Sequence, residues 1–417
     1  MSPRRRGAGD QASRPRNTPL LIIFATVVVD LIGFGIVLPI LPLWAERFGA
    51  SPTEIGVLTA VYSLMQFLFA PFWGRLSDRI GRRPVILITL VGSAVSALWI
   101  GLAGALWMLF AARILNGISG ASYSTAQAYV ADVTTREERA RGMGMIGAAF
   151  GVGFILGPAL GAVFSLISPE APFFAAAALA ALNALVAWRL LPESLRPDSA
   201  HTPRSRLDLV RRALASRAMA PYIWLSFVAT LAFAAMESTF ALLGKHRFGY
   251  DETRMALLFV VVGVAAAVGQ GFLVGRLVDR HGERPVMIAG LAGTALGLGL
   301  LAAAQNLAVL LVALVILGVL SGLAFATVTA LISKAGGDHE QGGVLGVTAS
   351  VSAAARIAGP LLGGVLFDHV APGAPMAAGA ALTALCLAGA AWIARGQGAG
   401  HPAPAESGRR SSGSEVP

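Results

Sequence analysis

The sequence predicts an all-α membrane protein whose twelve transmembrane helices form two pseudo-symmetric six-helix bundles. Of its 417 residues, 56% are hydrophobic and 13% are charged, whereas about 25% of residues are charged in soluble domains. Apolar segments of roughly 20 residues, long enough to cross a bilayer, recur along the chain. Two motifs each occur twice at nearly the same offset, which indicates that one half duplicates the other.

The apolar segments divide the chain into five regions. We expect helices near residues 19–44, 54–74, 85–103, 106–131, 142–166, 172–192, 219–243, 254–275, 286–304, 307–331, 343–367 and 374–395. The regions are a polar tail at 1–18, a first bundle at 19–192, a polar linker at 193–217, a second bundle at 218–395 and a tail at 396–417. The last tail is rich in Gly, Ser and Pro, and we expect it to be disordered.

The two halves share a charged motif and a glycine motif. GRLSDRIGRRPV at 74–85 matches GRLVDRHGERPV at 275–286, with an offset of 201 residues. GPALGAVF at 157–164 matches GPLLGGVLF at 359–367, with an offset of 202 residues. Repeats of six helices are typical of transporters, whose substrate site lies near the middle of the membrane between the halves.

The basic residues predict the orientation. Of the 32 lysines and arginines, 26 fall on the side of both termini and two lie inside expected helices. Four fall on the opposite side: Arg47, Lys245, Arg247 and Arg254. Because basic residues concentrate on the cytoplasmic side, we expect a multi-pass protein of the cell inner membrane with its tails and linker in the cytoplasm. The basic tracts alternate with apolar segments, so we expect them to meet anionic lipid and not nucleic acid.

The composition argues against an enzyme and against a resident cofactor. The chain has one cysteine, Cys386, and its six histidines lie in loops or at segment ends, so we expect no metal site. The sequence shows neither a nucleophile–base constellation nor the GxxxxGK[ST] motif of ATP-driven proteins. We therefore expect an ion gradient to drive its function and no cofactor to take part. We also expect the protein to be a monomer.

Four motifs carry a family resemblance. A loop motif contains Gly74, Leu76, Asp78, Arg79, Gly81, Arg82 and Arg83. A motif of the fourth helix contains Arg113, Asn116, Gly117 and Gly120, and one of the fifth contains Gly153, Gly157, Pro158 and Gly161. The first helix contains Asp30, Gly33, Pro39 and Pro42. With these motifs the chain, from about Leu20 to Arg395, resembles the major facilitator superfamily, and in particular the twelve-span drug/proton antiporters of the tetracycline-exporter type.

The resemblance implies a major facilitator fold and a function in proton-coupled transport. It implies export of a hydrophobic drug or secondary metabolite in exchange for protons; the alternative is a proton-coupled transporter of sugars or other metabolites. Tetracycline exporters typically carry further carboxylates in helices 3 and 9, where this chain has Ser96 and Thr294. The motif of helix 5 ends in Gly161-Ala162 where Gly-Gly is usual. The first departure bears on the substrate and not on the transport class.

Two carboxylates are the leading candidates for proton coupling. Of the 22 acidic residues, only Asp30 and Glu237 lie deep inside expected helices, and a charge there is costly enough to suggest a function. The helical rise places Asp30 roughly 20 Å from the cytoplasmic end of helix 1, and Glu237 about 12 Å from the outer end of helix 7. The alternatives are a structural ion pair or hydrogen bond for Asp30, and a cationic substrate or a hydrogen bond for Glu237.

Two arginines are the matching cations. The resemblance gives Arg113 a role in proton coupling, in which it pairs with Asp30 while that carboxylate is charged. A permanent salt bridge between helices 1 and 4 is the alternative. Arg356 in helix 11 is expected to be buried, and either Glu237 or the substrate could neutralise it.

The loop motif predicts a charge cluster at the cytoplasmic face. We expect Asp78, Arg82 and Asp132 to form it, and the resemblance implies that Asp78 approaches the start of helix 11 and acts as a gate. Arg79 and Arg83 are also expected to meet lipid. The further members of the gating motif are Gly74 and Gly81, with Asp279, Arg280 and Arg284 as the weaker counterpart in the second half.

The motif of helix 5 predicts a close helix contact. Gly153, Gly157 and Gly161 share one helix face, where small residues let another backbone approach, and Pro158 removes a hydrogen bond. We expect a hinge or a seal against helix 8 or 11, with ordinary packing as the alternative. Candidate substrate contacts are the polar, aromatic and Met side chains within spans: Tyr62, Gln66, Asn116, Tyr123, Gln127, Trp224, Met236, Phe240 and Gln270.

Overall fold

The structure, a computed structural model, describes residues 18–120, 122–135, 138–195, 215–216, 219–335 and 341–398. Every regular element within these residues is a helix, so the expected fold class is confirmed. The first bundle comprises α1 (Thr18–Val37), α2 (Leu41–Glu46), α3 (Pro52–Ile80), α4 (Arg82–Gly101), α5 (Leu106–Ser119), α6 (Ser122–Val133), α7 (Arg139–Ser165) and α8 (Ala171–Leu190). Residues 1–17 and 399–417 of the expected tails, and most of the linker at 193–217, lie outside the described residues. The expected boundaries shift at both ends, because Thr18 begins α1 and residues 396–398 belong to the last helix, where disorder was expected.

The second bundle follows the same plan. It comprises α10 (Ala220–Phe248), α11 (Glu252–Val268), the π-helix η1 (Gly269–Leu273), α12 (Val274–His281), α13 (Glu283–Ala303), α14 (Leu307–Ala335), α15 (Gln341–His369) and α16 (Ala374–Gly398). Ten helical segments of the described chain are long and apolar enough to cross a membrane. The two further spans are the α5–α6 pair and α16, so each bundle has six.

Two of the expected spans are interrupted. The first breaks at residues 38–40 into α1 and α2, because Pro39 lacks a backbone N–H and disfavours helical geometry in the residue before it. The fourth is divided into α5 and α6 next to Gly120. Neither break was expected from the sequence. Apolar residues continue across the first break, whereas small and polar residues surround the second.

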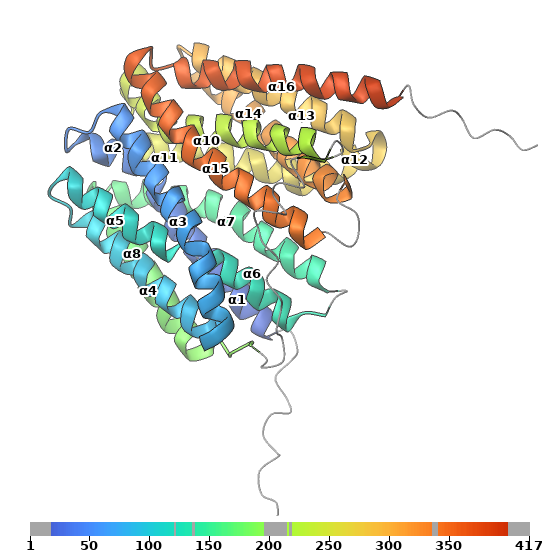
Figure 1. The fold of residues 1–417 in the computed structure, drawn as a ribbon. Coiled ribbons are helices and arrows are strands. Elements are labelled where there is room, and N and C mark those ends of the chain that lie inside the picture. The colour runs from blue at the N-terminus through green and yellow to red at the C-terminus, as the bar shows by residue number, and fades with distance from the viewer. Residues whose placement is uncertain are drawn as a thin grey trace, which may run out of the picture.

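The two bundles lie side by side at one end of the molecule and spread apart toward the other (Figure 1). We call the first end, where α2 lies, the α2 end. The opposite end, where α1 begins and α16 finishes, is the terminal end. This shape leaves the middle of the molecule flanked by both bundles.

Polar contacts join the bundles at the α2 end. Glu46 pairs with Lys245 at 2.7 Å and with the His246 ring at 2.7 Å, and Arg47 pairs with Glu252 at 2.8 Å. In the same region Thr53 Oγ1 donates to Asp368 Oδ2 at 2.7 Å. Close packing supports them, since a Cβ on Gly56 would lie 2.3 Å from the Pro360 carbonyl oxygen. We refer to the four polar contacts as the α2-end contacts.

The glycine motif of α7 packs on α1. A Cβ on Gly153 would lie 2.6 Å from Leu31 Cβ, and one on Gly157 would lie 2.6 Å from Gly35 Cα. The second bundle repeats this contact between α15 and α10, where a Cβ on Gly359 would lie 2.7 Å from the Leu231 carbonyl oxygen. The glycine face therefore seals a contact with α1 within the bundle, and not the expected contact with the eighth or eleventh span. The facing residue on α1 is itself glycine, so the two backbones touch. The fifth span, α7, does pack on the eighth span, α11, but through another face, where a Cβ on Gly263 would lie 2.5 Å from the Phe154 carbonyl oxygen.

Candidate functional site

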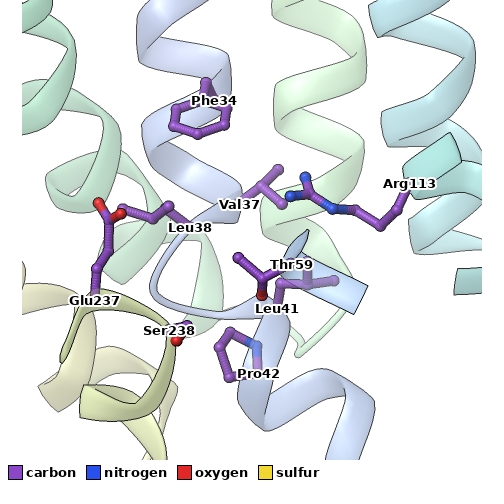
Figure 2. Close-up of a pocket in the computed structure, with 9 residues that line it drawn as sticks. All are labelled: Phe34, Val37, Leu38, Leu41, Pro42, Thr59, Arg113, Glu237 and Ser238. Carbon is purple, nitrogen blue, oxygen red and sulfur yellow. The ribbon is translucent and has the colours of Figure 1, made fainter. Parts of the chain in front are cut away.

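A small pocket lies between the bundles and has a charged group from each. Its volume is about 20 Å³, room for about one water molecule. Glu237 of α10 and Arg113 of α5 reach it from opposite sides of α1 in Figure 2. The remaining wall is mostly apolar: Phe34, Val37, Leu38, Leu41, Pro42, Thr59 and Ser238. Two groups that can carry opposite charges thus line one small, mostly apolar space, where electrostatic interactions are strong.

The charged residue that acts on Glu237 is Arg356, which lies on the neighbouring helix of the same bundle. The charge of Arg356 on α15 acts on the Glu237 carboxylate, although no ion pair joins the two among the described residues. The Arg356 side chain is exposed, and the expectation that it is buried is wrong.

Arg113 faces an aromatic ring in this structure. Only 4% of the residue is exposed, and its guanidinium carbon lies 4.4 Å from the centre of the Tyr62 ring. None of the ion pairs among the described residues joins Arg113 to Asp30, so the expected pairing is not formed here. The second span, α3, carries Tyr62 and so holds the Arg113 guanidinium in place.

Asp30 lies half-buried on α1, toward the terminal end from the pocket. Its charge reaches Tyr62, as do the charges of Arg113 and Arg356. The candidates from four helices therefore converge on the middle of the molecule, while Glu237 lies across α1 from Arg113. Such an arrangement can bind and release protons and can hold a polar group of a substrate.

The charge cluster of the loop motif forms at the terminal end. Arg82 Nη1 lies 2.5 Å from Asp78 Oδ1, and Arg82 Nε lies 3.0 Å from Asp132 Oδ2. Ser77 and Ser194 add hydrogen bonds to Arg82 and Asp132. The cluster joins α3, α4 and α6, and the expectation that Asp78, Arg82 and Asp132 form it is confirmed.

Glu193 completes this region and was missed in the sequence. Its carboxylate accepts hydrogen bonds from the backbone N–H groups of Arg82 at 2.9 Å and Arg83 at 3.2 Å. It thereby satisfies the first turn of α4, where a negative charge is favoured. Gly81 has φ +107° and would place a Cβ only 2.3 Å from Glu193 Oε2, so only glycine fits. Arg83 also donates to the Trp188 carbonyl oxygen, whereas Gly74 and Arg79 are open to their surroundings.

Arg82→Ala is expected to lower the free energy of unfolding by about 2 kcal/mol, because two carboxylates lose their shared cation. The loss is smaller than for a fully buried pair, since Asp78 remains largely exposed. Thermal unfolding in detergent measures it. The matched control is Arg79→Ala, in the same motif, with an expected change within about 0.5 kcal/mol. Equal effects of both variants would contradict the assignment of Arg82 as the centre of the cluster.

The second bundle carries the equivalent pair with reversed polarity. Glu283 occupies the position of Arg82 at the offset of 201, and Lys334 that of Asp132 at an offset of 202. Glu283 Oε1 lies 2.7 Å from Lys334 Nζ. The expected counterparts, Asp279, Arg280 and Arg284, are exposed, so the second cluster differs from the expectation. A single Arg-to-Glu difference in the loop motif is the sequence signal of this reversal.

The candidate substrate contacts separate into several groups. Met236 and Phe240 are 2% and 1% exposed and belong to the core, so they do not line the pocket. Asn116 donates to Ser96 at 2.7 Å, and Gln66 donates to the Gly120 carbonyl oxygen at 2.9 Å. Gln270 is exposed in the π-helix η1, an irregularity frequently found at functional sites.

The remaining candidates and the two positions of departure are also placed. Gln127 is half-buried on α6, Trp224 is 59% exposed, and the side chain of Tyr123 lies outside the described residues. Ser96 and Thr294 are buried and hydrogen-bonded within the protein. They therefore act as packing groups in the third and ninth spans, α4 and α13. The pocket residues Thr59 and Ser238 were not predicted from the sequence. Serine and threonine occur throughout the spans, so nothing in the sequence marks these two as pocket residues.

The fold and the charged pocket between its halves define a secondary transporter. The chain matches the family model of the Major Facilitator Superfamily over residues 23–273 and 245–415, and it belongs to this superfamily. Among its relatives is the tetracycline resistance protein, class C, of Escherichia coli, 36% identical over 380 residues that span 89% of this chain and 96% of the relative. Another is multidrug resistance protein 2 of Bacillus subtilis, 32% identical over 85% of this chain and 90% of the relative.

Solved structures agree with this assignment. The human organic anion transporter MFSD10 (TETRAN) is 27% identical, with a TM-score of 0.68 over 90% of this chain and 99% of the other. A bacterial homolog of the human lysosomal transporter Spinster is 16% identical, with a TM-score of 0.72 over 94% of this chain and 100% of the other. The second likeness shows the fold alone. The predicted major facilitator fold is thus confirmed.

Proposed function

We propose that this protein exports a hydrophobic drug or secondary metabolite from the cytoplasm in exchange for protons. The observation that carries the proposal is the pocket shared by Glu237 and Arg113 at the interface of the two bundles. A carboxylate there can exchange a proton while the cation supplies a counter-charge. The relatives support export, because their names describe tetracycline and multidrug resistance.

We propose that the terminal end faces the cytoplasm and that the α2 end faces the outside of the cell inner membrane. The distribution of 26 basic residues against four supports this orientation. Arg79, exposed at the terminal end, then meets the anionic lipid of the cytoplasmic leaflet. The pocket lies between two halves of one chain, which supports a monomer as the transporting unit.

On this orientation the structure corresponds to a state closed to the outside. The α2-end contacts hold the bundles together on that side, and the bundles spread apart toward the cytoplasm (Figure 1). Export requires these contacts to break and the terminal ends to approach each other, so that the pocket faces the opposite side. The gating role of the Arg82 cluster belongs to that second state.

Expression in a pump-deficient bacterium tests export. We expect the cells to accumulate less tetracycline or less of a cationic dye than cells with an empty vector. Addition of a protonophore should remove the difference, because the proton gradient drives the export. Unchanged accumulation across a broad panel of antibiotics and dyes would favour the transport of sugars or other metabolites instead.

Glu46→Gln is expected to shift the protein toward the state open to the outside, because it weakens two contacts between the bundles. Surface ion pairs contribute about 1 kcal/mol at most, so the population ratio changes about fivefold. Spin labels at positions 75 and 276, in a Cys386→Ala background, report the separation of the terminal ends. Glu170→Gln removes a charge from the loop before α8 and should leave the distances unchanged. Identical distance distributions for wild type and Glu46→Gln would contradict the role of these contacts.

A further inference from the structure

The surroundings of Arg113 contain an unusual partner for a buried cation. The guanidinium carbon lies 4.4 Å from the centre of the Tyr62 ring, within the range of a cation–π interaction. Its Nε atom is buried and has no hydrogen-bond partner in the described part of the chain. The face of the Tyr62 ring is therefore the contact through which α3 stabilises the Arg113 cation.

The Tyr62 ring is held firmly in this position. The ring packs against Phe34 in a tilted arrangement, with 5.6 Å between ring centres and 34° between the ring planes. Gln66 donates to the Tyr62 hydroxyl at 3.4 Å and to the Gly120 carbonyl oxygen at 2.9 Å, at the break between α5 and α6. A Cβ on Gly117 would lie 2.5 Å from the Tyr62 carbonyl oxygen, so α3 and α5 are in backbone contact here.

Tyr62 also lies within reach of three of the four charges proposed for proton coupling. Arg113, Asp30 and Arg356 all act on it electrostatically, and the pocket with Glu237 begins beside Arg113. An arginine that took one of these carboxylates as a permanent partner would keep it ionised. A second partner for the arginine, available while the carboxylate is protonated, lets the carboxylate take up a proton more readily.

We propose that Tyr62 is a positioning residue for proton coupling, and that its ring holds the Arg113 guanidinium while the coupling carboxylate is protonated. The inference rests on the proposed function. The neutral ring stabilises the cation without competing for the proton, because its attraction comes from the electron-rich face and not from an ionisable group. Arg113 can then exchange between the ring and a carboxylate during the transport cycle.

Stepwise fluorination of the ring tests this directly. Phenylalanine and its mono-, di- and trifluorinated forms are incorporated at position 62, and the protein is reconstituted into vesicles. Fluorine withdraws electrons from the ring face and changes its shape little, so each step weakens the cation–π contact. The pH at half-maximal proton-driven tetracycline transport is expected to fall stepwise, by about one pH unit over the series. The reason is that a guanidinium released from the ring pairs with a carboxylate and keeps it ionised.

Two comparisons separate the possible outcomes. Tyr62→Phe keeps the ring and should retain the wild-type pH profile, while Tyr62→Leu should shift it as trifluorination does. Tyr250→Leu removes an aromatic contact to Arg254 at the α2 end, 5.7 Å from ring centre to guanidinium carbon, and should not shift it. If the fluorinated variants transport tetracycline with the same pH at half-maximal transport, the inference is overturned and the proposed function stays intact.

A second readout covers inactive protein. If wild-type protein moved no tetracycline in response to a pH gradient, the proposed function would fail for this substrate, and the melting temperature of the fluorinated series would then test the contact itself. A stepwise fall that disappears in an Arg113→Gln background supports the contact. Equal melting temperatures throughout would overturn it.

Discussion

Glu237→Gln is expected to abolish transport driven by a pH gradient, reducing it to the level of vesicles without protein. Glutamine keeps the size and the hydrogen-bonding capacity of the side chain in the pocket but cannot take up or release a proton. Drug flux measured in vesicles with an imposed pH gradient tests this. Asp30→Asn is expected to have the same effect, since both carboxylates lie in the region where the charges converge.

Exchange of drug for drug separates loss of coupling from loss of binding. If Glu237 carries the proton, Glu237→Gln should still exchange labelled drug inside vesicles for unlabelled drug outside, with no pH gradient. If Glu237 instead binds a cationic group of the substrate, this exchange is lost as well. Glu170→Gln is the matched control at an acidic residue outside the pocket. Normal gradient-driven transport in both Glu237→Gln and Asp30→Asn would contradict the assignment.

Gly157→Val is expected to prevent folding of the first bundle, because even a Cβ at this position would lie 2.6 Å from Gly35 Cα. The obstacle is the backbone of α1, which cannot rotate away as a side chain can. Overpacking of ordinary cores already costs about 1–3 kcal/mol, and separating two helices in backbone contact exceeds this. The yield of monodisperse protein after size-exclusion chromatography in detergent measures the effect.

Gly151→Val provides the control for Gly157→Val. Gly151 is on the same helix, α7, but no atom lies within 4 Å of an added Cβ. The same chemical change there should leave the yield near that of wild type. If both variants were produced equally well, the contact between α7 and α1 would not be essential to the fold.

Most of the fold could be predicted from the sequence because the bilayer imposes strong requirements. A span must be long and apolar, and the duplicated motifs fixed the relation between the halves. The interruptions next to Pro39 and Gly120 were not predicted, because hydropathy averages over about a full span. The break at Gly120 matters for the site, since it exposes the carbonyl oxygen to which Gln66 donates.

The candidate site was predicted in its charges but not in its contacts. A charge within an apolar segment stands out in the sequence, so Arg113 and Glu237 were found, and the structure brings both to one pocket. The partner of Arg113 is an aromatic residue, and aromatic residues within spans are ordinary. Phe240 illustrates the converse, since its packing on Phe259 makes it part of the core.

The contacts across the bundles could not be predicted from local patterns. Glu46 and His246 are separated by 200 residues, and Thr53 and Asp368 by 315 residues. Each lies just beyond or at the edge of an apolar segment, where charged residues are expected in any membrane protein. Only the arrangement of the two bundles brings them together, and that arrangement depends on the state of the transporter.

Simultaneous measurement of drug and proton flux tests the central claim most directly. The purified protein is reconstituted into vesicles with an acidic lumen and an entrapped pH-sensitive dye, and tetracycline is added outside. We predict that tetracycline accelerates the loss of lumenal protons while it accumulates, and that Glu237→Gln vesicles show neither effect. Accumulation of tetracycline with no protein-dependent loss of protons would contradict proton-coupled export through this pocket.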